Sequence, residues 1–104
     1  MASVRWTVGA RDDLRRVIEY VSINSTAYAA ALADRMLSAV ERLEAYPRLG
    51  RVVPEYEDQA IREIIVGNYR VVYGLTDDDV AIVSVVHGSR SLLRKLGGEP
   101  WDLS

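Results

Sequence analysis

The spacing of apolar positions predicts two helices in the first half of the chain. Over residues 10–23 they recur every three or four positions, as on one face of a helix, at Ala10, Leu14, Val17, Ile18 and Val21. A second stripe, over residues 27–46, runs through Ala29, Leu32, Met36, Val40 and Leu43. Ser25 or Thr26 can cap the second helix, and Pro47 ends it. The short linker makes the two helices an antiparallel hairpin.

Short segments rich in β-branched and aromatic residues predict strands. Residues 3–8, "SVRWTV", alternate in polarity, and three apolar segments follow at 60–66, 69–75 and 80–86. Tight turns between these three segments predict an antiparallel meander. The last segment is apolar on both faces, which favours a central strand. We expect an irregular connection at 47–59, a final helical turn in "SRSLLRKL" and a flexible tail at 97–104.

This order of elements predicts one two-layer α+β domain over residues 1–96. An N-terminal strand and an α-helical hairpin would pack on a three- to four-stranded antiparallel sheet. The hairpin covers one face, so the other face is expected to stay partly open. Arg62 and Arg70 are placed on that open face, with His87 as a further candidate. Apolar residues on the exposed surface, such as Ile64, Val72 or Leu92, would then mark a partner site.

Composition narrows the chemistry. The chain has 104 residues, no cysteine, one histidine and a formal net charge of −2. Too few nitrogen and sulfur ligands are present for a zinc site, and no pattern indicates another metal or a cofactor. No secretory leader or membrane-spanning run is visible, so we expect a cytoplasmic protein. Twelve of the thirteen basic residues are arginine, which favours bidentate contacts with carboxylates or phosphates.

The stretch "SVVHGSRSL" ends the last predicted strand with the only histidine. His87 could act as an acid or base, or it could be a strand-end residue satisfied by the backbone. Arg70, Arg90 and Arg94 could form a positive patch for a phosphate or an acidic partner. Alternatively, they pair with surface carboxylates such as Glu63 or Asp77. Tyr73 could be an interface anchor, although core packing is the commoner place for such a residue.

Four segments in this order resemble the RelE/ParE superfamily, the toxins of type II toxin–antitoxin systems. They are "ARDDL", "AYPRLGR", "IREIIVGNYRVVYGL" and "VAIVSVVHGSRSL", and the resemblance spans about residues 4–96. RelE-like members are ribosome-dependent endoribonucleases, whereas ParE-like members inhibit DNA gyrase. The resemblance implies a cognate antitoxin as partner, in a toxin–antitoxin hetero-oligomer. An acidic antitoxin segment would pair with the arginines.

The resemblance favours the ParE-like branch. Arg70, in "NYRVVY", and Arg90 match arginines of the ribonucleases, but "REIIV" stands where those enzymes carry lysines, and "SLLRKL" has no tyrosine. The implied function is a gyrase inhibitor without catalytic residues. Its contact candidates toward target or antitoxin are Arg62, Arg70, Tyr73, His87, Arg90 and Arg94. The alternatives are an mRNA endoribonuclease using Arg70, His87 and Arg90 on the ribosome, or an inactive member that binds only antitoxin.

Overall fold

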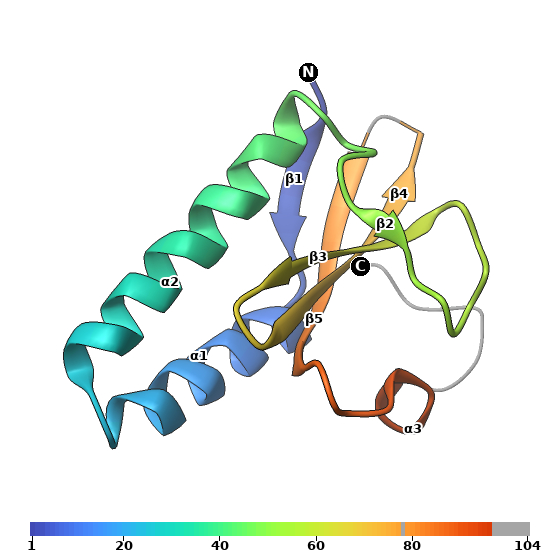
Figure 1. Ribbon diagram of the computed structural model, residues 1–104. Helices are drawn as coiled ribbons and strands as arrows, with labels where there is room; N and C mark the ends of the chain where they lie inside the picture. The colour runs from blue at the N-terminus through green and yellow to red at the C-terminus, as the bar shows by residue number, and fades with distance from the viewer. Residues whose placement is uncertain (78, 97–104) are drawn as a thin grey trace.

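The computed structural model describes residues 1–77 and 79–96, and the predicted tail at 97–104 lies outside these residues. The elements run in the order β1 (Ser3–Trp6), α1 (Val8–Ser22), α2 (Thr26–Glu41), the 3₁₀ helix η1 (Arg42–Glu44), β2 (Arg51–Val52), β3 (Ile61–Val66), β4 (Tyr69–Thr76), β5 (Asp79–His87) and α3 (Leu92–Leu96). The α1–α2 hairpin lies along one side of the sheet, and α3 lies beyond the end of β5 (Figure 1). The predicted two-layer α+β class is confirmed.

The described strands form one mixed sheet in the order β1-β5-β4-β3-β2. β3, β4 and β5 make the predicted antiparallel meander, and β5 has a neighbour on each side, as its apolar pattern indicated. The expected three to four antiparallel strands are wrong in two respects. β1 pairs parallel with β5, which is possible because the helical hairpin and three strands separate them in the chain. β2 was missed because two residues are too few to show alternation.

The ends of the helices differ from the prediction. α1 begins at Val8, two residues early, because the Thr7 hydroxyl accepts the Ala10 N–H and donates to the Ile82 carbonyl oxygen at 2.9 Å. Gly9 therefore lies inside α1, and Asp13 lies beyond the first turn of this helix. The predicted Ser25 cap of α2 is confirmed, since its side chain accepts the Tyr28 N–H. Helix α2 ends at Glu41 and tightens into η1 before the proline, so its expected extension to residue 46 is wrong.

Both faces of the sheet are covered. The main core lies under the hairpin, where Leu32, Met36 and Tyr73 are fully buried. A second, smaller core lies on the opposite face, made by Val53, Ile61, Val72, Val86 and Leu92. The expectation of a partly open face is therefore wrong. Val72 and Leu92, expected on the surface, are fully buried, because α3 and the chain after β2 close over that face.

Candidate functional site

Arg70 lies at the centre of a buried ion-pair network. Its Nε donates to Glu63 Oε1 at 2.6 Å, and its two terminal nitrogens donate to the two carboxylate oxygens of Glu55 at 2.8 Å each. The second oxygen of Glu63 accepts from Arg51 Nε at 2.6 Å. The side chains of Arg70 and Glu63 are 8% and 0% exposed. The alternative in which Arg70 pairs with Glu63 is therefore confirmed.

The network shifts the titration of its members. The hydrogen bonds from Arg70 hold the pKa of the Glu55 carboxyl below its ordinary value of 4.5, although burial acts in the opposite direction. The same bonds to Glu55, followed by those to Glu63, raise the pKa of the Arg70 guanidinium. Two arginines and two glutamates give the network a net charge of zero. Arg70 therefore offers no unsatisfied positive charge to a ligand.

Arg70 and His87 lie on opposite faces of the sheet. Side chains alternate along a strand, and Tyr69 and Val71 both pack in the core under the hairpin, so Arg70 between them points to the opposite face. His87 lies opposite Tyr69 in the β4–β5 pairing, and their rings meet edge to face with centroids 5.5 Å apart. The expected open-face set of Arg62, Arg70 and His87 is therefore not formed.

Arg62 and Tyr73 both stabilise the turn before β2. The Arg62 guanidinium donates to the carbonyl oxygens of Arg48, Gly50 and Gln59. The Tyr73 hydroxyl accepts the Gly50 N–H at 2.9 Å and donates to the backbone carbonyl oxygen of the preceding proline at 2.8 Å. Tyr73 is fully buried, and burial raises the pKa of its phenol. Its expected core position is confirmed, and its ring is not available as a surface anchor.

His87 stands in a turn at the end of β5. Its Nδ1 accepts the Ser89 backbone N–H at 3.2 Å and lies 2.8 Å from the Ser89 hydroxyl. Because Nδ1 accepts a backbone proton, the neutral ring carries its own proton on Nε2. The strand-end interpretation of His87 is therefore confirmed. Arg90 and Arg94 are exposed, and within residues 1–77 and 79–96 neither side chain forms an ion pair.

A groove of about 550 Å³ follows the end of β5, with α1 on one side and the segment leading into α3 on the other. Figure 1 shows the two helices on either side of this end of the strand. We call it the α1–α3 groove. The polar and aromatic side chains that line it include Arg16, Tyr20, Tyr69, His87, Arg90 and Lys95. The groove therefore brings together two of the predicted contact residues, His87 and Arg90, with other side chains that the sequence did not indicate as their neighbours.

Asp13 also lines the α1–α3 groove. Its Oδ2 accepts from the Ser84 hydroxyl at 2.8 Å, the Val85 N–H at 3.0 Å and Lys95 Nζ at 2.7 Å, while Oδ1 accepts from Arg16 at 3.3 Å. The position has a simple cause. β1 ends opposite Ile82, so the edge of β5 beyond that point has no strand beside it, and Asp13 from α1 takes the free N–H. Lys95 in turn fixes α3 to α1.

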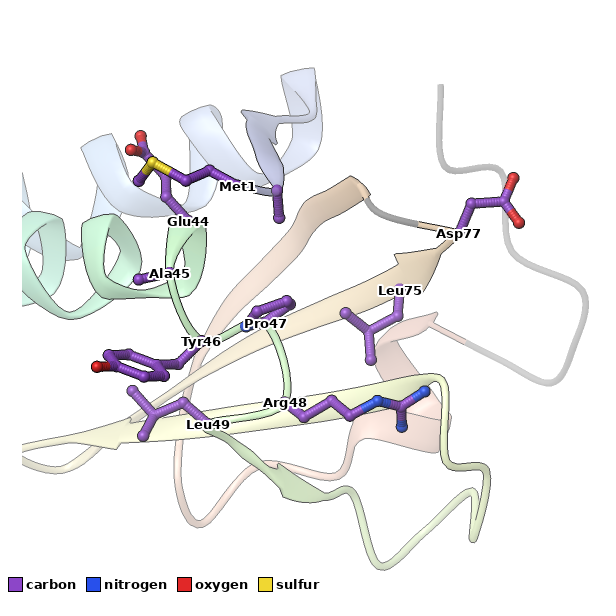
Figure 2. Close-up of a pocket in the computed structure, with 10 residues that line it drawn as sticks. Met1, Glu44, Ala45, Tyr46, Pro47, Arg48, Leu49, Leu75 and Asp77 are labelled. Carbon is purple, nitrogen blue, oxygen red and sulfur yellow. The ribbon is translucent and has the colours of Figure 1, made fainter.

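A second hollow, of about 850 Å³, lies where the turn "YPRL", residues 46–49, comes close to the first two residues of the chain (Figure 2). Tyr46 and Leu49 lie together at one end, and the side chains of Arg48 and Asp77 extend on the opposite side. Glu44 points toward the chain's first residue. The charged side chains that line the hollow lie apart and do not converge on one point. The hollow contains none of the predicted contact residues, and its lining indicates no particular ligand.

Three residues of these ion-pair networks were not found by the sequence analysis: Asp13, Glu55 and Lys95. Asp13 is 71 positions from Ser84 and 82 positions from Lys95. Glu55 lies in the irregular connection, 15 positions from Arg70. No local spacing pairs such residues. The one available signal was the surplus of arginines, which need carboxylate partners when buried.

Neither a metal site nor a membrane-spanning helix is found within residues 1–77 and 79–96. No three histidine, aspartate or glutamate side chains among them gather as a metal site. None of the helices in those ranges is both long enough and apolar enough to cross a membrane.

Comparison with known proteins places these features in a family. Residues 4–92 match the family model described as the ParE toxin of the type II toxin–antitoxin system, parDE. Toxin ParE3 of Caulobacter vibrioides is 35% identical over 86 residues, which are 82% of this chain and 85% of that protein. Toxin RelE2 of the same organism is 33% identical over 91 residues, covering 86% and 99%.

Solved structures agree on the fold. The chromosomal ParDE system of P. aeruginosa contains a chain with a TM-score of 0.68 at 19% identity, covering 84% of this chain and 96% of that one. The toxin–antitoxin complex RelBE2 of Mycobacterium tuberculosis contains one with a TM-score of 0.53 at 24% identity, covering 83% and 96%. The family model spans most of the chain, and both curated relatives exceed 30% identity. The chain therefore belongs to the ParE/RelE family of type II toxin–antitoxin toxins.

Proposed function

We propose that this toxin acts by binding DNA gyrase rather than by cutting RNA, and that a cognate antitoxin neutralises it. The antitoxin is supported by the two structural neighbours, whose names are those of toxin–antitoxin pairs. The relatives named ParE3 and RelE2 match at nearly equal identity, 35% and 33%. The choice between gyrase inhibition and RNA cleavage therefore rests on the chemistry of the site.

The neutralised state of Arg70 is the observation that carries this choice. A ribonuclease must stabilise the charge that develops on the scissile phosphate, and Arg70 is one of the two arginines, with Arg90, that the resemblance matches to that task. Here Glu55 and Glu63 occupy all three nitrogens of its guanidinium. Breaking a buried ion pair by removing one partner typically costs about 3–5 kcal/mol. A phosphate would have to compete with two carboxylates that are already in place.

The remaining ribonuclease candidates do not complete an active site around Arg70. His87 lies on the other face of the sheet, and its Nδ1 is occupied by the turn. A general base needs an orienting group and access to the proton that it removes. The net charge of −2 also opposes entry into a ribosomal RNA site, where several phosphates must be neutralised. A binding mechanism requires none of these groups to be catalytic.

The test compares two activities of the same purified chain. We expect inhibition of gyrase supercoiling of a relaxed plasmid, with mRNA left intact on translating ribosomes. An inert control is the same chain after heat denaturation. Cleavage of mRNA in the ribosomal A site with normal supercoiling would overturn the proposal in favour of a ribonuclease. If neither activity were affected while antitoxin still bound, the gyrase assignment would fail and the inactive-member alternative would stand.

A further inference from the structure

The α1–α3 groove is locally basic on an acidic protein. Arg16, Arg90 and Lys95 give it three positive charges, and Asp13 gives it one negative charge, for a balance of +2. The whole chain has a net charge of −2. Asp13 is 7% exposed and already accepts four hydrogen bonds, so it offers little repulsion to an incoming anion. Arg90, in contrast, is exposed and has no carboxylate partner among the described residues.

At Val85, the edge of β5 is closed to one common mode of peptide binding. A free strand edge can accept an added strand through its backbone groups. Along β5 beyond Ile82, however, the Val85 N–H is taken by Asp13, and Lys95 Nζ lies 3.4 Å from the Val85 carbonyl oxygen. At Val85, a ligand must therefore be held by side chains rather than by backbone pairing.

Aromatic side chains give the groove a second kind of contact. Tyr20 on α1 is 69% exposed, and the half-buried ring of Tyr69 meets the exposed ring of His87 edge to face. Tyrosine at such a site supplies a large contact area together with a hydroxyl group. Cations beside tyrosine rings suit a peptide that alternates carboxylates with apolar side chains. A nucleic acid would need a longer row of cations to follow its phosphates.

From this combination we propose that the α1–α3 groove binds an acidic segment of the cognate antitoxin. Arg16 and Arg90 would hold its carboxylates, and Tyr20 and Tyr69 would pack against its apolar side chains. The inference rests on the antitoxin of the proposed function, but not on the identity of the toxin's target. It names the surface on which the toxin and antitoxin meet.

The chemistry can be tested on the full chain with a short synthetic peptide of alternating glutamate and leucine. We expect it to move the backbone amide signals of Arg16, Tyr20, His87 and Arg90 in ¹⁵N-labelled toxin. The same peptide with glutamine in place of glutamate should move them much less. A single-stranded DNA oligonucleotide is the alternative ligand. Equal shifts with the glutamine peptide, or larger ones with DNA, would contradict the proposal.

The source of the segment is tested by titrating purified cognate antitoxin into toxin variants by calorimetry. The double variant R16Q/R90Q should bind at least roughly tenfold more weakly, and salt should weaken binding to the unaltered toxin more than to this variant. The matched control R5Q/R48Q removes two exposed arginines elsewhere and should change affinity by less than about threefold. The single variant R90Q is the control for misfolding of the double variant, because Arg90 forms no ion pair within residues 1–77 and 79–96 and its loss should leave the fold intact. Equal affinity of R16Q/R90Q and unaltered toxin would contradict the proposal that the groove binds the antitoxin. The gyrase proposal is tested separately, by the supercoiling assay.

Discussion

Replacing Arg70 by methionine tests whether its ion-pair network stabilises the fold. R70M leaves Glu63, whose side chain is fully buried, with Arg51 as its one remaining cationic partner in the network. Glu55 is 25% exposed and regains water, so it contributes less. Loss of one partner from a buried pair costs about 3–5 kcal/mol, and the surviving Arg51 contact places this case near 3 kcal/mol. For a domain of this size, that loss lowers Tm by roughly 12 °C or more.

Urea unfolding followed by tryptophan fluorescence measures this loss. The control R11M removes an exposed arginine that forms no ion pair within residues 1–77 and 79–96, and should stay within about 0.5 kcal/mol of the unaltered chain. If R70M matched R11M, the reasoning would be refuted, because the network would then contribute nothing. Adding Glu63→Met to R70M should recover part of the loss, since it removes the uncompensated buried charge.

The R70M substitution should also change how the free energy of unfolding depends on pH. Glu55 has its pKa lowered by Arg70, so its contribution to the free energy of unfolding is present above about pH 4.5. That contribution is lost as the pH falls through the lowered folded-state value. We expect the unaltered chain to lose stability over this acid range and R70M to lose less. Parallel pH curves for the two proteins would contradict the assignment.

Three further substitutions test the remaining structure. Tyr73→Phe removes both hydrogen bonds that hold the turn before β2 and should cost about 1–3 kcal/mol in urea unfolding. Gly50→Ala places a Cβ 2.5 Å from a β3 carbonyl oxygen and should cost at least about 2 kcal/mol of stability. In Gly9→Ala the nearest atom is 3.9 Å from the new Cβ, so this substitution should stabilise α1. Thermal unfolding should therefore show a lower Tm for Gly50→Ala and a higher Tm for Gly9→Ala. Lys95→Met removes the contact with Asp13 and should speed amide hydrogen exchange in α3, while unchanged protection would show that apolar packing alone holds that helix.

The candidate site was only partly visible in the sequence. The sequence offered an ion pair of Arg70 with Glu63 as one of two alternatives, and that pair exists. Arg90 follows His87 by three residues in the sequence, and in the structure a backbone hydrogen bond joins the two in one turn. The sequence placed Arg62, Arg70 and His87 on one face, however, because it supplied no pairing register. Once Tyr69 lies opposite His87, Arg70 must point the other way.

The sequence by itself determined the helical hairpin and the antiparallel meander, and it favoured a core position for Tyr73. These features depend on spacings of two to four residues, which are set by the geometry of a single strand or helix. Only the tertiary structure decided the parallel pairing of β1, the closure of the second sheet face and the meeting of Asp13 with Lys95. Each of these joins segments far apart in the chain. Local periodicity carries no information about such pairs, because packing of the whole domain selects them.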